Sequence, residues 1–417
     1  TTRIDVGNLK IALLPKKNRG ETVTVMMNFR YGDAKSLFGR SAAKQMTASM
    51  LTRGTDKLTR QDIDDKLTEL KVQGGPSGFV TTRENLPKAL ELVFSLYKDS
   101  SFPEDEFKQL KKQMIVMLES MRDKPDMLAK NAIDQHFNTY PKGDVRYEPS
   151  IAEALEELNK TEDKDLKNFH SQFYGTARGE ISIVGDFDAK AVEKLIREDY
   201  AKYVSSAPYA EIYKEYKPVK AERIVIDTPE KENATIIARS DFSMNDTNPD
   251  APALQVANWI LGGGTGLSNR LIDRLRQEGL SYGAGSGVKI PGKGDQASFI
   301  FRAIVAPQNL LKAEASAKDV IAKAVKDGFT DDEVREAKKG LLQSMDVARS
   351  QDPIVASSWN DKMSLNRDWS FSKARAEAIK NLTTEQVNAA LRKYIKPEDM
   401  TFVLAGDQKK AQAAQKK

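Results

Sequence analysis

The feature that most constrains the fold of this chain is an internal repeat with a period of about 220 residues. The segment Phe102–Phe107 (FPEDEF) resembles Phe329–Val334 (FTDDEV). Each segment is followed at the same offset by a pair of lysines, Lys111–Lys112 and Lys338–Lys339, and then by an apolar stretch rich in Met or Leu. The register therefore holds over about three turns of a predicted helix.

A second match lies further along each repeat. Leu158–Asp163 pairs with Leu382–Gln386, and the strand-like Ile181–Asp186 pairs with Thr401–Asp407. Solenoid repeats run about 20 to 50 residues, so a period this long indicates two duplicated domains.

These matches divide the chain into a first domain (1–204), a linker (205–222) and a second domain (223–417). The linker contains Pro208 and Pro218, and proline disfavours helix at the residue before it. We expect an extended segment, held to a surface by its three tyrosines.

Each predicted domain mixes amphipathic helices with short strands in which apolar residues alternate. The strand predictions are Val23–Phe29, Ile224–Asp227, Ile236–Arg239 and Ala297–Ile304. This pattern indicates an α+β fold in which each domain has a sheet packed with helices.

Composition excludes several function classes. The 65 basic and 60 acidic residues leave a net charge of +5 that is spread along the chain, so no basic stripe marks a nucleic-acid interface. The longest apolar runs, such as Ile181–Val184 and Thr401–Ala405, are far shorter than the roughly 20 residues of a membrane helix. The chain has no cysteine, which excludes thiolate chemistry and is compatible with either the cytosol or an oxidising envelope.

A predicted helix over 36–53 contains the positions that bear most on function. Gln45 and Ser49 stand at i and i+4, the spacing at which a helix presents two histidines to one zinc ion. Ala48 lies between them, where a glutamate would activate water. Neither Gln nor Ser is a good zinc ligand, and Ala offers no donor.

This helix resembles that of the M16 family of zinc peptidases (pitrilysin, insulinase and mitochondrial processing peptidase), which carries His-x-x-Glu-His. Met50–Leu51 and Gly54–Thr55 keep the family's frame. In that register the two family histidines fall on Gln45 and Ser49, and the general-base glutamate falls on Ala48. The resemblance therefore implies a fold of two homologous M16-type domains with a degenerate metal motif.

The family's third zinc ligand is a glutamate on a later helix, and the best-matched position here is Glu119. One carboxylate cannot hold zinc alone, so we expect no metal on this chain. The only histidines, His136 and His170, are predicted to be partly exposed helix residues. Glu119 itself is equally well read as a solvated or ion-paired residue, since Arg122 follows one turn later.

A glycine loop at 262–266 opens a second informative segment. It is a poor phosphate cradle, because it follows a predicted helix and no Gly-Lys-Ser/Thr comes after it. The segment instead resembles the M16 stretch in which Arg-Leu and Leu-Arg precede Gly-Leu-x-Tyr. The matching residues are Arg270–Leu271, Leu275–Arg276 and Gly279–Tyr282.

In the family this Arg and Tyr come from the zinc-free half and contact substrate beside the metal, so the resemblance assigns that role to Arg276 and Tyr282. A guanidinium and a phenol can both donate hydrogen bonds to a developing oxyanion. The spacing is one residue shorter than usual, which leaves Arg274 as a second candidate. Without the frame, Arg276 would be an ordinary exposed residue and Tyr282 a half-buried one.

The resemblance implies a non-catalytic half or subunit of a zinc metalloendopeptidase, which helps to bind and position a peptide at a partner's zinc. The partner would be a His-x-x-Glu-His-bearing M16 subunit or fused half, and the paired bacterial members imply a periplasmic heterodimer. The alternative is an inert scaffold or peptide-binding subunit of a larger complex. A self-sufficient hydrolase is disfavoured, because no Gly-x-Ser-x-Gly is present. Thr1 follows no initiator Met or signal peptide, so we expect a processed product or an arbitrary boundary, and upstream fusion stays open.

Overall fold

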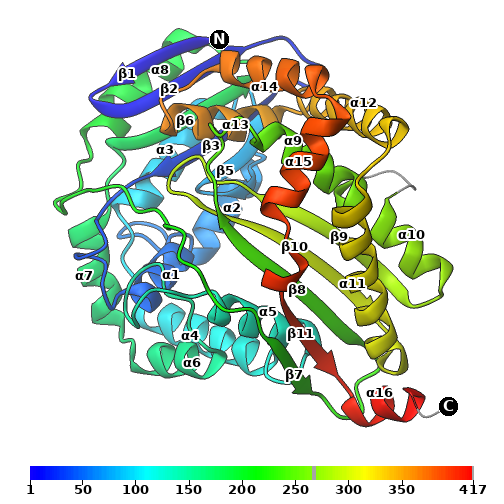
Figure 1. Ribbon diagram of the computed structural model, residues 1–417. Coiled ribbons are helices and arrows are strands. Elements are labelled where there is room, and N and C mark those ends of the chain that lie inside the picture. Colours follow the sequence, from blue (N-terminus) through cyan, green and yellow to red (C-terminus); the bar gives the residue numbers. More distant parts are fainter. Residues whose placement is uncertain (265–268, 416–417) are drawn as a thin grey trace.

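A computed structural model describes residues 1–264 and 269–415. The glycine loop predicted at 262–266 therefore lies partly outside the described residues. The fold is α+β, with two mixed, mainly antiparallel sheets and helices around them (Figure 1).

The first sheet has the order β1-β2-β6-β3-β5-β4, in which only β2 and β6 are parallel. Its strands are β1 (Thr2–Val6), β2 (Asn8–Pro15), β3 (Thr22–Phe29), β4 (Gln73–Gly75), β5 (Gly78–Thr82) and β6 (Arg178–Gly185). The helices of the first half of the chain are α1 (Ser41–Met50), α2 (Arg60–Glu69), α3 (Leu86–Lys98), α4 (Glu104–Glu119), α5 (Pro125–His136), α6 (Ile151–Lys160), α7 (Asp163–Phe173) and α8 (Ala189–Glu198), followed by the 3₁₀ turn η1 (Tyr200–Lys202).

The second sheet has the order β7-β11-β8-β10-β9, in which only β7 and β11 are parallel. Its strands are β7 (Arg223–Asp227), β8 (Ala234–Ser243), β9 (Ser281–Lys289), β10 (Gln296–Val305) and β11 (Thr401–Gly406). The helices of the second half of the chain are α9 (Ala251–Asn258), the π-helix η2 (Trp259–Gly263), α10 (Arg270–Gln277), α11 (Leu310–Asp327), α12 (Asp331–Ala348), α13 (Asp352–Ser364), α14 (Trp369–Asn381), α15 (Thr384–Tyr394) and α16 (Gln408–Gln415), with 3₁₀ turns η3 (Pro307–Asn309) and η4 (Pro397–Asp399).

The two sheets share one topology, which is the structural form of the sequence repeat. Without β1, the order and directions of the first sheet match those of the second, strand for strand. The predicted strands all lie within β3, β7, β8 and β10. Residues 203–222 contain no helix or strand, as predicted for the linker, while the domain boundaries themselves stay a prediction.

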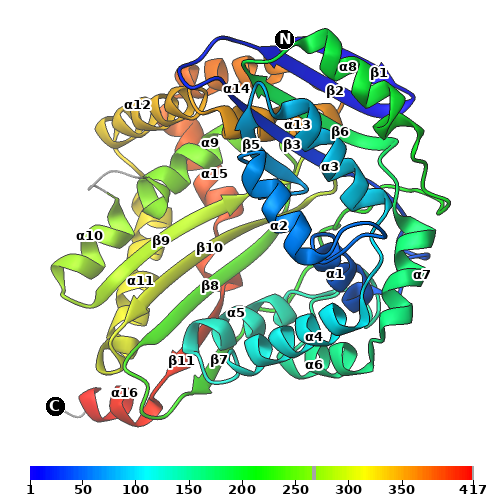
Figure 2. The same cartoon turned by 180° about the vertical axis from the view of Figure 1, so that it is seen from behind.

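Each half donates one helix to the sheet of the other half (Figures 1 and 2). The apolar face of α5, with Ile133 and Phe137, packs on β8 and β11 of the second sheet. In return α13 places Trp359 against Ala12 of the first sheet, and Ser182 Oγ donates to Asn360 Oδ1 at 2.5 Å. Burial of apolar surface in both directions joins the halves into one packed unit.

The helix predicted over 36–53 is shorter than expected, since α1 begins only at Ser41. Residues 34–39 form turns, because Asp33 and Ser36 bond to each other's backbone N–H groups and Gly39 has a φ of +71°. Local side-chain bonds of this kind compete with helix formation. The apolar spacing continued through this segment, and so the prediction missed the turn.

Candidate functional site

The degenerate metal motif lies on the exposed face of α1. Gln45, Ala48 and Ser49 are all exposed, while Met46 and Met50 on the opposite face are fully buried. The Ser49 hydroxyl donates to the Gln45 carbonyl oxygen at 3.2 Å, a bond within the helix. The helix thus presents the three positions together, as the i, i+4 spacing predicted.

The residues of α4 that lie beside Gln45 are apolar. Met114, Met117 and Leu118 line a small cavity of about 90 Å³ with Gln45, and Glu119 is not among its walls. Glu119 is exposed and stands two residues after Met117, which is about 200° around a helix. Glu119 therefore does not share this cavity with Gln45, and its assignment as the third ligand position stays a prediction.

The histidines take no part in this site. His136 lies at the end of α5, where its Nε2 is 3.0 Å from the Lys220 carbonyl oxygen and 2.9 Å from Thr401 Oγ1. His170 was predicted to be partly exposed, and this was wrong, because it is buried and its Nε2 lies 2.7 Å from the Tyr97 carbonyl oxygen. Burial lowers the pKa of His170. Both side chains serve packing between elements.

The other predicted pair lies on α10 and β9. Leu271 and Leu275 bury one face of α10, which leaves Arg276 exposed near its end. Gly279, with a φ of +63°, turns the chain into β9, and Tyr282 follows with 73% of its surface exposed. The structure thus places Arg276 and Tyr282 on either side of one turn, both open to solvent.

A β-bulge explains the exposure of Tyr282. Gly283 pairs with Ile304 and Ser281 pairs with Val305, so Tyr282 is the extra residue between the two pairs. Bulges bend a strand locally and redirect a side chain. Tyr282 is therefore the unpaired residue at the bulge, in a strand whose other residues are half-buried or exposed.

Arg274, the second candidate, is already engaged. Its guanidinium pairs with Glu278 and lies 3.8 Å from Asp319. Among the described residues no carboxylate comes within 4.0 Å of Arg276 in an ion pair, so Arg276 is the better placed of the two to meet an outside ligand.

The strand that carries Tyr282 is a free sheet edge, since β9 pairs only with β10. Gly283, Gly285 and Gly287 share one face, and Cβ atoms added at Gly283 or Gly287 would meet nothing within 4 Å. The edge therefore offers unpaired backbone groups beside open space.

Similarity to known proteins agrees with this arrangement. Residues 161–341 match the family model described as the peptidase M16 inactive domain. The non-peptidase homolog YmxG of Helicobacter pylori is 22% identical over 396 residues, which are 93% of this chain and 89% of that protein. Residues 161–341 therefore resemble the M16 inactive domain, and the likeness to YmxG extends over nearly the whole chain.

Further M16 relatives include active enzymes. The zinc protease PqqE of Helicobacter pylori is 22% identical over 75% of this chain and 71% of its own length. The peptidase M16 inactive domain of Pseudomonas fluorescens has the same fold, with a TM-score of 0.81 and 20% identity over 97% of this chain and 98% of that chain. The periplasmic protease PqqL of Escherichia coli aligns with a TM-score of 0.70 and 14% identity over 99% of this chain and 48% of its own.

The side chains at the degenerate motif do not fit zinc. Within residues 1–264 and 269–415, no group of three or more His, Asp or Glu side chains could hold a metal ion. The cavity beside Gln45 contains one carboxylate, that of Glu157, among an amide, a hydroxyl and two thioethers, and a single carboxylate is too few ligands for Zn²⁺. The same part of the chain has no helix long and apolar enough to cross a bilayer.

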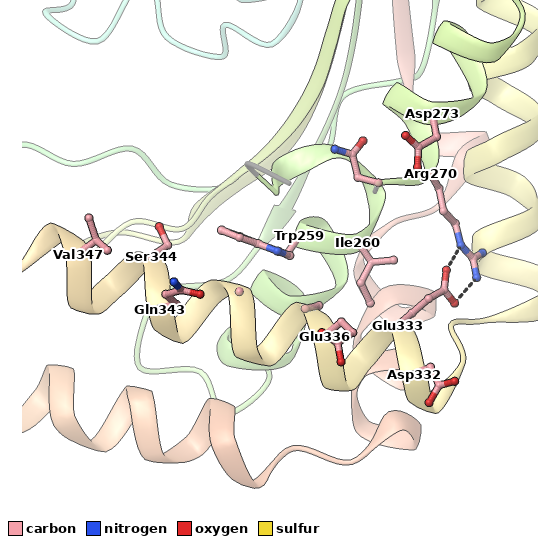
Figure 3. A pocket seen from close by; sticks show the side chains of 13 residues that line it. Trp259, Ile260, Arg270, Asp273, Asp332, Glu333, Glu336, Gln343, Ser344 and Val347 are labelled. Atoms are coloured by element: carbon pink, nitrogen blue, oxygen red, sulfur yellow. Dashed lines mark hydrogen bonds and ion pairs between the residues drawn. The ribbon is translucent and has the colours of Figure 1, made fainter. Parts of the chain in front are cut away.

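Sequence reasoning missed a cavity of about 860 Å³ between α12 and the η2–α10 segment (Figure 3). Its walls include Trp259, Asp273 and Glu336, none of which stands in a recognisable motif. The residues come from segments separated by some 60 to 75 positions, so only the folded chain brings them together. The one sequence signal that could have indicated this cavity is the acidic first turn of α12. Acidic residues also stabilise the N-terminus of any helix, so this signal is not specific.

Proposed function

We propose that this chain is the non-catalytic half or subunit of an M16 zinc metalloendopeptidase, and that it binds and positions the peptide substrate at its partner's zinc. One combination carries the proposal. The residues at the metal-motif positions cannot ligate zinc, whereas Arg276 and Tyr282 are exposed together beside a free strand edge. The matched inactive-domain model supports the non-catalytic part of the proposal.

The β9 edge would bind an extended peptide through backbone hydrogen bonds. The glycine face of β9 leaves room for peptide side chains that a larger residue would obstruct. Backbone pairing fixes the direction and depth of a peptide without selecting its sequence, which suits a subunit whose task is positioning.

Tyr282 Oη and the Arg276 guanidinium would donate hydrogen bonds to the scissile carbonyl as negative charge develops on its oxygen. The partner's His-x-x-Glu-His would hold the zinc ion, which would supply Lewis-acid chemistry at that carbonyl or activate water. The Arg276 guanidinium supplies N–H donors, and the Tyr282 phenol supplies an O–H donor. Neither residue needs to exchange a proton with the substrate.

The partner would be an M16 protein that carries His-x-x-Glu-His, with which this chain forms a heterodimer or to which it is fused. Support comes from relatives, since PqqE is described as a zinc protease and the PqqL neighbour as a periplasmic protease. A periplasmic location follows by analogy with PqqL and is part of the same proposal.

The decisive test is Tyr282→Phe in the assembled enzyme. Loss of one oxyanion donor should lower kcat by about 10²-fold, while the peptide Kd changes by less than about threefold, because the donor acts mainly in the transition state. Tyr213→Phe, on an exposed linker tyrosine, is the matched control and should leave kcat unchanged. Unchanged turnover by the Tyr282→Phe enzyme would remove the role assigned to this side chain.

A second candidate is an inert scaffold or peptide-binding subunit, favoured by the description of YmxG as a non-peptidase homolog. Native mass spectrometry with metal analysis on the protein from its source separates the two. Zinc confined to a copurifying or fused M16 half supports the split peptidase. A metal-free assembly without a protease partner supports the scaffold, and stoichiometric zinc on this chain alone contradicts both.

A further inference from the structure

The cavity beside η2 lies in the second half of the chain, between α12 and the η2–α10 segment. In each domain the first helix after the second strand of the repeat, α1 or α9 with η2, packs beside the long helix α4 or α12. The space at this position is about 90 Å³ in the first domain and about 860 Å³ in the second. The smaller space is bounded by α1, α4 and α6, and the larger one by η2, α10 and α12, so the two cavities have different walls.

The cavity between α12 and the η2–α10 segment is strongly acidic. Four carboxylates line it, from Asp273, Asp332, Glu333 and Glu336, against a single guanidinium, that of Arg270. Glu333 is already neutralised by Arg270, at 2.7 and 2.8 Å, and Arg335 pairs with Asp332 and Glu336 from the outer side of α12. Asp273 has no ion pair within 4.0 Å among the described residues, so an uncompensated negative charge faces the cavity.

An indole lines another part of the same cavity, on the side of Ser344 and Val347 in the view of Figure 3. Trp259 is half-buried, and its indole packs close to Gly340 of α12. A Cβ added at Gly340 would come within 3.1 Å of the indole Nε1, so the absence of a side chain there makes room for the ring. Trp is the side chain with the strongest cation–π attraction. A cavity that is lined by an indole and by several carboxylates suits an organic cation.

A buried amide adds a second polar feature. Asn269 is 2% exposed and lines the cavity, and its Oδ1 accepts the Ile272 N–H at 3.0 Å to cap α10. In the part of the chain that the structure describes, its Nδ2 reaches only the Gly264 carbonyl, at 3.5 Å, which is the outer limit of a hydrogen bond. A buried amide donor with so weak a partner suits an incoming carbonyl oxygen.

The cavity is close to the proposed substrate site. Asp273 and Arg276 stand at i and i+3 on α10, so they lie on neighbouring turns of one helix face, about 4.5 Å apart along its axis. A peptide that reaches Arg276 could therefore place a neighbouring side chain beside Asp273.

We propose that this cavity is a specificity pocket for a basic side chain, arginine or lysine, of the bound peptide, with Trp259 against the cation and Asp273 and Glu336 as its counter-ions. This inference rests on the proposed function, because it assumes that a peptide lies along α10 and β9. The side-chain amide of Asn269 would donate a hydrogen bond to a backbone carbonyl of the peptide and so help to fix the peptide's position.

The test uses the full chain and three end-capped heptapeptides that differ at one central residue: arginine, its neutral isostere citrulline, or norleucine. Isothermal titration calorimetry at low salt should give a Kd at least about tenfold lower for the arginine peptide than for the citrulline peptide. In Asp273→Asn/Glu336→Gln that ratio should fall to about one. Asp346→Asn, an exposed charge change on the same helix α12, should preserve it.

Glu333 is left intact because it also closes the capping box of α12 with Thr330. Trp259→Phe should weaken the arginine peptide more than the norleucine peptide, and circular dichroism confirms that each variant is folded. Equal Kd values for arginine and citrulline, or a preference that survives Asp273→Asn/Glu336→Gln in the folded variant, would overturn the pocket. The Tyr282→Phe effect on turnover would be untouched by that result, so failure of the pocket and failure of the proposed function are distinguishable.

Discussion

At the scale of single residues, hydrogen bonds at element ends fix the surroundings of the degenerate motif. Glu153 closes the capping box of α6 by accepting the Ser150 N–H at 2.8 Å, and it also accepts from the Tyr147 hydroxyl at 3.0 Å. These bonds, with Lys142 nearby, lower the pKa of Glu153 to about 2. Helix α6 packs on α4 and lines the small cavity beside Gln45. The Glu153 carboxylate therefore stabilises a helix that forms one wall of that cavity.

Glu153→Gln should destabilise the protein by about 1–2 kcal/mol at pH 7, through the lost charge-assisted cap. The folded-state pKa lies below the ordinary value of 4.5, so this stabilisation is present above pH 4.5 and fades as the pH falls toward 2. Urea unfolding from pH 7 down to pH 3 should show the two proteins converging. The exposed neighbour in Glu156→Gln should change stability far less, and a Glu153→Gln deficit that is constant with pH would contradict the assignment.

At the scale of elements, the fit of α1 against α4 decides which side chains could ever share a metal. The sequence spacing suggested Glu119, whereas the packed helices bring Met114 and Met117 to Gln45. The reason is helical phase, because an error of two residues along α4 rotates a side chain to the opposite face. Sequence reasoning fixed the phase within α1 and could not fix it between two helices.

Zinc binding should therefore be restored through Met117 rather than Glu119. Gln45→His/Ala48→Glu/Ser49→His should bind zinc weakly, and addition of Met117→Glu should tighten binding by at least about tenfold, since it supplies a third ligand on the facing helix. Met117 is 46% exposed, so the added carboxylate is tolerated there. Competition against a chromogenic chelator measures the affinity.

Glu119→Gln, made in that fourfold variant, serves as the control and should not change the zinc Kd. Tight binding by the triple variant that disappears on Glu119→Gln would show that Glu119 is the ligand after all.

At the scale of the whole molecule, the exchange of α5 and α13 makes the two domains depend on each other. Trp359 is 3% exposed and packs with Met363 and Ala12 across the boundary between the halves. Such a contact has high sequence separation, and neither domain can form it alone. The chain should therefore respond as one cooperative unit, and its β9 edge should keep a fixed position relative to the first domain.

Trp359→Ala should cost about 3–5 kcal/mol and destabilise both sheets together. Hydrogen exchange with mass spectrometry should show faster exchange in β6 and in β11 by similar factors. Ile354→Ala, on the exposed side of α13, should have little effect on either strand. Faster exchange in the first sheet alone would show that the domains unfold independently.

The sequence by itself determined the duplication, the α+β class, the family frame and the loss of the metal-binding side chains, because each is a local pattern or a comparison of two local patterns. The tertiary structure decided what depends on contacts between distant segments: the exchange of α5 and α13, the burial of His170, and the identity of the α4 side chains that lie beside Gln45. It also decided the bulge that exposes Tyr282 and the acidic cavity around Trp259. These features follow from the phase and register between elements, which are set by packing of the whole chain and leave no mark in the spacing of any one segment.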